Sequence, residues 1–316
     1  MIDQFGRSID YLRLSVTERC TLRCTYCRVE EGICPKAAEL SADEYARIGK
    51  ACARLGIHKV RITGGEPLLR KDILEIIQKL SAIDAITEIT MTTNAQQLAG
   101  RANALKEAGL KRLNISLDTL DAAKYHEMTG GELSTVLSAI DEAIEAQLLP
   151  LKINTVIVKG KNDDEVDDLM ALAKERPIEV RFIELMPIGA LGQNDAMRVN
   201  NDVLIAARPF LQPLPPCYPG QPARDYAVDG YMGRVGFISP LSHKFCASCN
   251  RIRVMSDGKI RPCLGSNMEI ETKEALASKD DEVLLETIRN AIYHKPDGHH
   301  FNTGFISEKN MSRIGG

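Results

Sequence analysis

The sequence predicts an α/β fold, a partial (βα)6 barrel of the TIM type followed by an extension that contains a β-hairpin. Over the first 190 residues, six short apolar runs rich in β-branched residues alternate with stretches of helical spacing. This alternation indicates βα units and a parallel sheet with right-handed crossovers. Beyond residue 190 the pattern changes to clustered prolines and short strand-like runs. We therefore expect two parts, residues 1–190 and residues 191–316.

The first part is expected to contain strands separated by helices. The strands are the apolar runs Tyr11–Val16, Lys59–Thr63, Glu88–Thr93, Arg112–Leu117, Leu151–Val158 and Glu179–Met186. The helices are the stretches Ala42–Leu55, Lys71–Ile83, Gln96–Ala108, Thr135–Gln147 and Asp163–Lys174. Six βα units in a row favour a barrel-like sheet, complete or partial, over a small nucleotide-binding unit.

The second part begins with a segment that breaks regular structure. Six of the fourteen prolines fall between Pro209 and Pro222, which predicts a linker or an ordered covering loop. Strand-like runs follow at Arg234–Ser239, Arg251–Met255 and Ile260–Leu264. An Asp-Gly turn between the last two runs predicts a hairpin, and a helix is expected at Asp281–Ile292.

Composition and charge exclude several classes of protein. Of 316 residues, 44% are apolar and 26% are charged, and the net charge is −3. This balance argues against disorder, and against a nucleic-acid binder that depends on a basic excess. No apolar run approaches the roughly 18 residues of a membrane span. Because the start, Met1–Arg7, lacks the apolar stretch of a secretory signal, we expect a cytoplasmic protein with no membrane partner.

Nine cysteines are the first unusual feature. Their odd number, in a long chain without an export signal, argues against a disulfide framework. Six of them form two tight groups, Cys20, Cys24 and Cys27, and Cys246, Cys249 and Cys263. Clustered thiols in a reducing compartment indicate metal binding. Cys52 lies in a helical stretch and is interpreted as a small buried apolar residue; no role is assigned to Cys34, Cys52 or Cys217.

The first triplet follows directly on the first expected strand. It therefore lies at the carboxyl end of that strand, the face that carries active sites in parallel barrels. Three thiolates can hold three irons of a [4Fe-4S] cubane and leave the fourth iron open for chemistry. The alternative is a structural zinc site with Cys34 as the fourth ligand.

The second triplet is followed by two arginines at alternate positions. If Arg251–Val254 is a strand, Arg251 and Arg253 project to one face. Paired guanidinium groups beside an open iron would suit a polyanion such as a triphosphate. The alternatives are a structural zinc site completed by His243, and two solvated arginines on a strand edge.

Two motifs together resemble the S-adenosylmethionine (SAM) radical enzymes. One is Cys20-x3-Cys24-x2-Cys27, with Tyr26 before the third cysteine. The other is Thr63-Gly64-Gly65-Glu66-Pro67 at the end of the second strand. The two glycines let backbone approach a ligand closely, and the carboxylate of Glu66 could take up an ammonium. In that superfamily this segment binds the methionine amino end of SAM.

The remaining motifs are similar to one family within that superfamily, the GTP 3′,8-cyclases. They are Ile9–Thr17, Gly236–Pro240, Phe245–Arg251 and the closing Gly315-Gly316. The chain departs from the family pattern at Glu18 and Thr21 around the first cysteine, at Arg28-Val29, and at Ala95, where the family often has glycine. No departure removes a cluster ligand, so only local loop geometry is affected.

The resemblance implies an activity and its cofactors. A 5′-deoxyadenosyl radical would convert GTP to (8S)-3′,8-cyclo-7,8-dihydroguanosine 5′-triphosphate, the first step of molybdenum cofactor biosynthesis. Each cysteine triplet would hold a [4Fe-4S] cluster. It also implies a reducing electron donor, a homodimer and transfer of product to cyclic pyranopterin monophosphate synthase.

Site residues follow from the same resemblance. The SAM pocket would be lined by Tyr26, Gly65, Ser116 and Met186. The contacts to GTP would come from Arg13, Arg61, Thr92, Lys152, Arg251, Ile252 and Arg253. The catalytic residues would be Arg13, Arg251, Arg253, Gly315 and Gly316, with the terminal glycines threading into the active site.

Two other functions are weighed against this one. Another two-cluster radical SAM enzyme, such as a peptide-modifying enzyme, would be expected to show additional cysteines for a fully ligated second cluster. An iron–sulfur electron carrier or a zinc-scaffolded binding module would not explain the Gly-Gly-Glu-Pro segment or six βα units.

Overall fold

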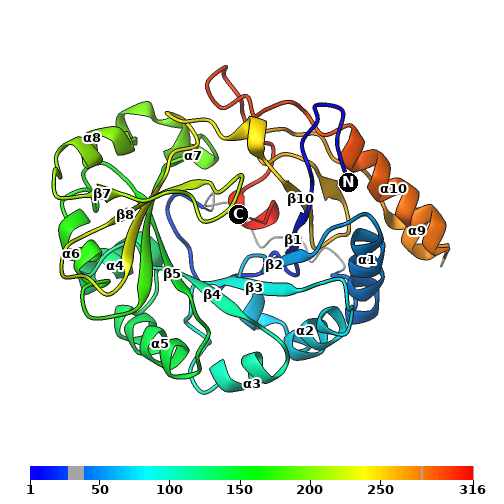
Figure 1. The fold of residues 1–316 in the computed structure, drawn as a ribbon, viewed down its shortest axis with the longest axis horizontal. Helices are drawn as coiled ribbons and strands as arrows, with labels where there is room; N and C mark the ends of the chain where they lie inside the picture. The colour runs from blue at the N-terminus through cyan, green and yellow to red at the C-terminus, as the bar shows by residue number, and fades with distance from the viewer. Residues whose placement is uncertain (28–38, 279, 316) are drawn as a thin grey trace.

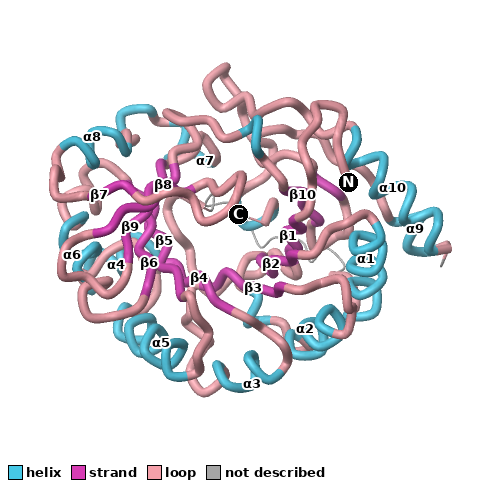
Figure 2. Tube along the Cα trace, viewed as in Figure 1, coloured by secondary structure: helices cyan, strands magenta, loops and turns pink. Residues whose placement is uncertain are grey.

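The structure is a computed structural model that describes residues 1–27, 39–278 and 280–315. One sheet of eleven strands curves around a central space, with helices outside it (Figures 1 and 2). The six predicted strands are confirmed, at β1 (Tyr11–Ser15), β2 (Lys59–Thr63), β3 (Glu88–Thr93), β4 (Arg112–Ser116), β5 (Leu151–Ile157) and β6 (Ile178–Glu184). They pair in sequence order, and all are parallel.

The predicted helices are also present and cover the outer face of the sheet (Figure 2). They are α1 (Ala42–Arg54), α2 (Ile73–Ser81), α3 (Ala102–Glu107), α5 (Leu133–Glu145) and α6 (Val166–Ala171). Ser41 caps α1, because its hydroxyl accepts from the amide of Glu44 while the Glu44 carboxylate accepts from the amide of Ser41. The buried face of α1 includes Tyr45 and Cys52, which confirms Cys52 as a core residue.

The C-terminal part adds strands to both edges of this sheet. β10 (Arg251–Val254) pairs in parallel with β1, and β9 (Arg234–Ile238) pairs in parallel with β6. The predicted hairpin is confirmed, since β11 (Ile260–Arg261) runs antiparallel to β10. β8 (Ala223–Ala227) and β7 (Gln212–Pro213) extend the other edge antiparallel.

The sheet is therefore continuous across residue 190. Its order is β11-β10-β1-β2-β3-β4-β5-β6-β9-β8-β7, with no pairing between β11 and β7 among the described residues. The barrel is partial, as the sequence predicts, and the proline-rich segment lies at its open side. In that segment Gly220 has a φ of +77°, and a Cβ there would lie 2.6 Å from the Ser248 carbonyl oxygen. The segment is an ordered cover packed against the second cysteine loop.

Several short elements were not predicted from the sequence. They are the strands β7 and β8, the helices α4 (Ala122–Thr129), α7 (Gly189–Gln193), α8 (Asn201–Ala206) and α9 (Lys273–Ala277), and the 3-10 turns η1 (Pro67–Leu69), η2 (Asp195–Met197), η3 (Cys246–Ser248) and η4 (Met311–Arg313). The predicted last helix is α10 (Asp281–Tyr293). No helix in the described part of the chain has the length and apolar character to cross a membrane.

Side chains along the strands alternate between two environments. In β1, Leu12 and Leu14 are fully buried in the layer between sheet and helices. Arg13, between them, lines the central cavity instead. The same alternation in β10 sends Ile252 into the apolar core and Arg251 and Arg253 into the cavity. The strand period thus places charged side chains inside the barrel.

Candidate active site

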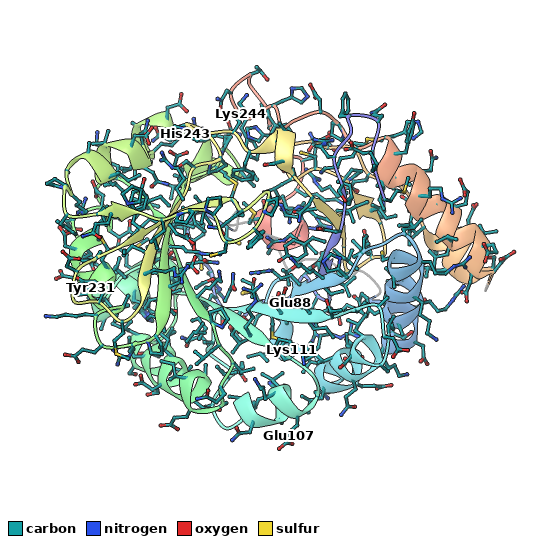
Figure 3. The ribbon with its side chains drawn as sticks, in the orientation of Figure 1. Glu88, Glu107, Lys111, Tyr231, His243 and Lys244 are labelled. Carbon is teal, nitrogen blue, oxygen red and sulfur yellow. The ribbon has the colours of Figure 1, made fainter. Side chains whose placement is uncertain are left out.

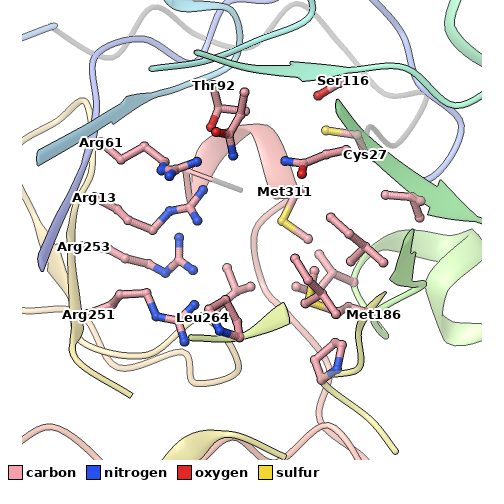
Figure 4. Close-up of a pocket in the computed structure, with 18 of the residues that line it drawn as sticks. Arg13, Cys27, Arg61, Thr92, Ser116, Met186, Arg251, Arg253, Leu264 and Met311 are labelled. Carbon is pink, nitrogen blue, oxygen red and sulfur yellow. The ribbon is translucent and has the colours of Figure 1, made fainter. Parts of the chain in front are cut away.

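A cavity of about 350 Å³ fills the centre of the barrel. All six cysteines of the two triplets line it, although more than two hundred residues of sequence separate the groups. The other expected residues that line it are Arg13, Tyr26, Arg61, Gly65, Thr92, Ser116, Met186, Arg251 and Arg253. Figure 4 shows the four arginines on one wall, with Cys27 and Ser116 across from them. The structure therefore brings both thiol groups to one space.

The first triplet lies on a loop after β1 that is tied to the end of α4. The amide of Cys27 donates to the Cys24 carbonyl at 2.9 Å. The amides of Arg23 and Thr25 donate to the carbonyls of Thr129 and Met128. An unpredicted helix, α4, thus holds the cysteine loop at the carboxyl edge of the sheet.

The glycine pair after β2 packs directly on this loop. A Cβ at Gly65 would lie 2.0 Å from the Arg19 carbonyl oxygen, a distance that no side chain can accept. The amide of Gly65 donates to the Thr17 carbonyl at 2.7 Å. Glycine is therefore required here for the close approach of two backbone segments beside the cysteines.

Glu66 has a different place from the one its motif suggested. Its side chain is fully buried and accepts from the Thr93 hydroxyl, the Asn94 amide and the Leu68 amide, at 2.7, 2.7 and 3.0 Å. Burial raises the pKa of Glu66, and these hydrogen bonds oppose that rise. In this structure Glu66 joins the ends of β2 and β3 and does not line the cavity as a partner for an ammonium.

A tyrosine–aspartate pair stands next to the first triplet. The Tyr26 hydroxyl donates to Asp118 Oδ2 at 2.6 Å, and the Val156 amide donates to Asp118 Oδ1 at 2.9 Å. Burial raises the pKa of Asp118 to about 6 despite both hydrogen bonds. Sequence reasoning missed Asp118; its position two residues after Ser116 at the end of a predicted strand was the available signal.

The register of the sheet brings together Arg13, Arg61, Arg251 and Arg253, which form one wall of the cavity, the arginine wall. Arg13 pairs with Arg61 of β2 on one side and with Arg253 of β10 on the other. Burial and then the positive charge of Arg253 lower the pKa of Arg13. Burial and the charge of Arg251 lower the pKa of Arg253 to about 10. Like charges packed this closely favour an anion in the cavity.

Unpaired hydrogen-bonding groups in this cavity also indicate a bound polar ligand. Within the described part of the chain, Nε and Nη2 of Arg251 and Nη2 of Arg181 have no hydrogen-bond partner. Asn154 Oδ1 is also unpaired there. Buried polar groups are costly unless they find a partner. Both Arg181 and Asn154 were missed, although their alternate positions on predicted strands would have placed them in the lumen.

Lys152 and Ile252 do not line this cavity. Lys152 donates to Glu179 Oε2 at 2.8 Å and lines a second cavity of about 470 Å³ at the amino ends of the strands. Ile252 is buried on the opposite face of β10. Their assignment as GTP contacts stays a prediction.

The tail reaches the arginine wall. The carbonyl oxygen of Gly315 accepts from Arg253 Nη1 at 2.7 Å. Gly315 has a φ of +66°, and a Cβ there would lie 3.0 Å from Thr63 Oγ1. Gly316, Cys34 and Arg28-Val29 lie outside the described residues.

The other singled-out residues lie away from the cavity or support it. His243 pairs with Asp202 at 2.6 Å on the surface, where Figure 3 labels it. Cys217 is exposed, with its sulfur 3.3 Å from Arg234 Nη1. Ala95 has a φ of +62°, a conformation that glycine adopts freely and that costs alanine about 1–2 kcal/mol.

The residues fit iron–sulfur chemistry at both triplets. Each offers three soft sulfur ligands that face one cavity, as a cubane with an open iron requires. No group of three His, Cys, Asp or Glu side chains among residues 1–27, 39–278 and 280–315 is arranged to hold a single metal ion. The cysteines of a cubane bind different irons and need not meet at one ion. Gly64, Gly65 and the Tyr26–Asp118 pair line the same cavity beside the first triplet, where a cofactor bound to that cluster would lie.

Comparisons with known proteins agree with this arrangement. Residues 14–173 match the family model of the Radical SAM superfamily, and residues 178–301 match that of Molybdenum Cofactor Synthesis C. The GTP 3′,8-cyclase of Alkaliphilus oremlandii (strain OhILAs) is 47% identical, and that of Clostridium acetobutylicum is 44% identical, each over 100% of both chains.

A solved structure shows the same fold. Streptococcus suis SuiB bound to S-adenosylmethionine superposes with a TM-score of 0.59 at 17% identity, over 92% of this chain and 64% of that chain. The radical SAM superfamily consists of enzymes that use SAM and an iron–sulfur cluster. The chain therefore belongs to the radical SAM superfamily and, within it, to the GTP 3′,8-cyclase family.

Proposed function

We propose that this chain is a GTP 3′,8-cyclase, which converts GTP to (8S)-3′,8-cyclo-7,8-dihydroguanosine 5′-triphosphate as the first step of molybdenum cofactor biosynthesis. One observation carries the proposal: both thiol triplets and four arginines, Arg13, Arg61, Arg251 and Arg253, face a single cavity. A reaction that joins a SAM-derived radical to a polyanionic nucleotide needs both cofactor sites and a cationic wall in one water-poor space.

Two [4Fe-4S] clusters are part of this proposal. Cys20, Cys24 and Cys27 would hold the cluster that binds SAM, with Tyr26, Gly65, Ser116 and Met186 around the cofactor. Cys246, Cys249 and Cys263 would hold the second cluster, on the substrate side. When bound, SAM supplies the 5′-deoxyadenosyl radical that takes a hydrogen atom from the substrate.

The protein's own part is to bind and orient the nucleotide. Arg13 and Arg61 are neighbours on β1 and β2 and both line the cavity, so an anionic triphosphate would offset their mutual repulsion. Arg251 and Arg253 extend the same wall toward the second triplet. Thr92 on β3 completes the proposed GTP contacts that line the cavity. Lys152 and Ile252, which do not line it, are proposed as GTP contacts from the family resemblance alone.

The tail is proposed to act in the site through Gly315 and Gly316. Deletion of both glycines should abolish GTP-dependent product formation, because Arg253 loses the carbonyl that it holds at 2.7 Å. Iron content and SAM binding should be unchanged, which separates a site effect from loss of fold. Full cyclase activity in the shortened protein would contradict this role.

The decisive experiment measures product under anaerobic conditions. The reconstituted full chain should contain about eight irons, cleave SAM when reduced, and form the cyclic nucleotide only when GTP is present. SAM cleavage without any GTP-dependent product would favour another two-cluster radical SAM enzyme. Zinc in place of iron would exclude both.

The partners and location complete the proposal. We expect an external reducing electron donor, a homodimer, a cytoplasmic location, and transfer of product to cyclic pyranopterin monophosphate synthase. Each of these stays a prediction.

A further inference from the structure

A buried lysine stands beside the second triplet and has no role in the function proposed above. Lys295 follows α10, and its residue is 2% exposed. It lines the central cavity together with Cys249 and Cys263. The sequence showed no pattern that singled it out.

The position of Lys295 is fixed by contacts to the cysteine loops. Its ammonium donates to the carbonyl of Pro262, the residue before Cys263, at 2.5 Å. The backbone on its other side is held by Arg7, whose guanidinium donates to the carbonyls of Pro296 and Asp297 at 2.6 and 2.7 Å. The same guanidinium donates to the carbonyl of Cys246 at 3.1 Å. One arginine thus joins the lysine segment to the second triplet.

The ammonium lacks an anionic partner of the usual kind. No carboxylate of the described residues forms an ion pair with Lys295, and the Pro262 carbonyl is neutral. Burial lowers the pKa of Lys295, the thiolates of Cys249 and Cys263 favour its charged form, and Arg7 and Arg251 oppose it. A buried cation without a counter-ion is costly. The negative charge that offsets it comes from the thiolates of Cys249 and Cys263 and from the cluster that they would hold.

We propose that Lys295 is the counter-ion of the iron–sulfur cluster held by Cys246, Cys249 and Cys263, and that it raises the reduction potential of that cluster. The inference rests on the second cluster of the proposed function. A fixed positive charge stabilises the reduced state, which carries one more negative charge, and cluster potentials follow local charge and burial. Lys295 acts through its charge on the cluster and contacts no reacting atom.

The test uses the full chain with the first triplet replaced by alanine (Cys20→Ala, Cys24→Ala and Cys27→Ala), so that one cluster signal is observed. Lys295→Met and Lys295→Arg are compared in this background by redox titration followed by electron paramagnetic resonance. The matched control is Lys244→Met, which removes an exposed lysine two residues before Cys246, at the edge of the molecule in Figure 3.

The proposal predicts a more negative potential for Lys295→Met only. Lys295→Arg keeps the charge and should stay near the reference, as should Lys244→Met, because solvent screens an exposed charge. Loss of the cluster from Lys295→Met with retention in Lys295→Arg would also support a counter-ion. An unchanged potential in Lys295→Met, or cluster loss from both Lys295 variants while Lys244→Met retains it, would overturn the inference.

Failure of the proposed function would look different. If the reference protein, with only the second triplet, holds no iron after reconstitution, the second cluster itself is refuted. If it holds about four irons and the reduction potential of this cluster is the same in the Lys295 variants, only the role of the lysine is refuted.

Discussion

The two cysteine triplets offer the same ligands, but Cys24 of the first and Cys249 of the second lie in opposite electrostatic surroundings. At the first, burial and the negative charge of Asp118 raise the pKa of the Cys24 thiol. At the second, burial also raises the pKa of the Cys249 thiol, but the charges of Arg251 and Lys295 outweigh it and bring the pKa to about 6. The residues around each thiol, more than the thiol itself, therefore determine which kind of ligand each site accepts. This contrast is what the proposed function expects, with a sulfonium beside the first triplet and a polyanion beside the second.

Both cysteine loops are nevertheless held by the same kind of contact. A glycine from another segment packs against the backbone of each loop: Gly65 on Arg19, and Gly220 on Ser248. In both places a side chain would force the backbone apart. The two sites therefore share this close glycine packing and differ in the charges around their thiols.

Removal of one thiol from either triplet should have the largest effect on activity. Cys24→Ala should abolish SAM cleavage, because the open-iron cluster requires all three thiolates. Cys263→Ala should abolish formation of the cyclic nucleotide and leave SAM cleavage intact. Each variant should lose about half of the iron.

The control for these two variants is Cys217→Ala, since Cys217 is exposed and belongs to neither triplet. Its iron content and activity should match those of the unaltered protein. If Cys263→Ala also lost SAM cleavage, the two triplets would not be separable in function.

A smaller effect is expected from Arg7, which supports only the second side. Arg7 pairs with the buried carboxylate of Asp3 at 2.6 Å and donates to the carbonyls described above. Arg7→Met should lower the free energy of unfolding by about 3–5 kcal/mol, because it leaves a buried charge unpaired. Denaturant unfolding of the cluster-free chain measures this loss.

The matched control is Arg54→Met, which breaks an exposed pair with Glu282. Surface pairs of this kind contribute about 0–1 kcal/mol. In the loaded protein, Arg7→Met should weaken iron retention at the second triplet and spare the first. Equal losses from both triplets would show that Arg7 acts on the whole fold.

The smallest expected effect concerns Asp118 and the pH. Its pKa of about 6 lies above the unfolded value of 3.8, so the native chain binds more protons than the unfolded chain between these values. Its contribution to stability is therefore fully present below pH 3.8 and is lost as the pH rises toward 6. Because asparagine does not titrate, Asp118→Asn should lack this pH-dependent loss of stability.

The stability of Asp118→Asn relative to the unaltered chain should therefore increase by about 1 kcal/mol between pH 5 and pH 7. Denaturant titrations of the cluster-free chains at both pH values measure the difference. If the difference in free energy of unfolding between the two chains stays constant with pH, burial does not raise the pKa of Asp118.

Much of the fold could be predicted because its signals are local. The β-branched runs gave the six parallel strands, and the alternation at Arg251 and Arg253 gave a shared face. The helix α4 was missed although Asp121 caps its start and Gly130, at a φ of +74°, ends it. Those cap residues were a readable signal.

Other features depend on distant partners and have no local signal. Nothing near β10 shows that it pairs with β1, and nothing near Glu66 shows that Thr93 and Asn94 occupy its carboxylate. Lys152 sits on a predicted strand, but its bond to Glu179 places it at the second cavity. The cysteine motifs located the site, and the sheet register decided which cations enter it.

The pairing of β1 with β10 also sets the order of events during synthesis. The strand that precedes the first triplet is among the earliest segments to leave the ribosome, and its neighbour β10 is among the last. Until then the nascent chain carries an unpaired strand edge, the kind of edge that invites wrong pairing. Pairing across such a distance is also slow to form. When β10 docks, one event covers the free edge of β1, delivers Arg251 and Arg253 and brings the second triplet to the first, so the cavity forms only late in synthesis.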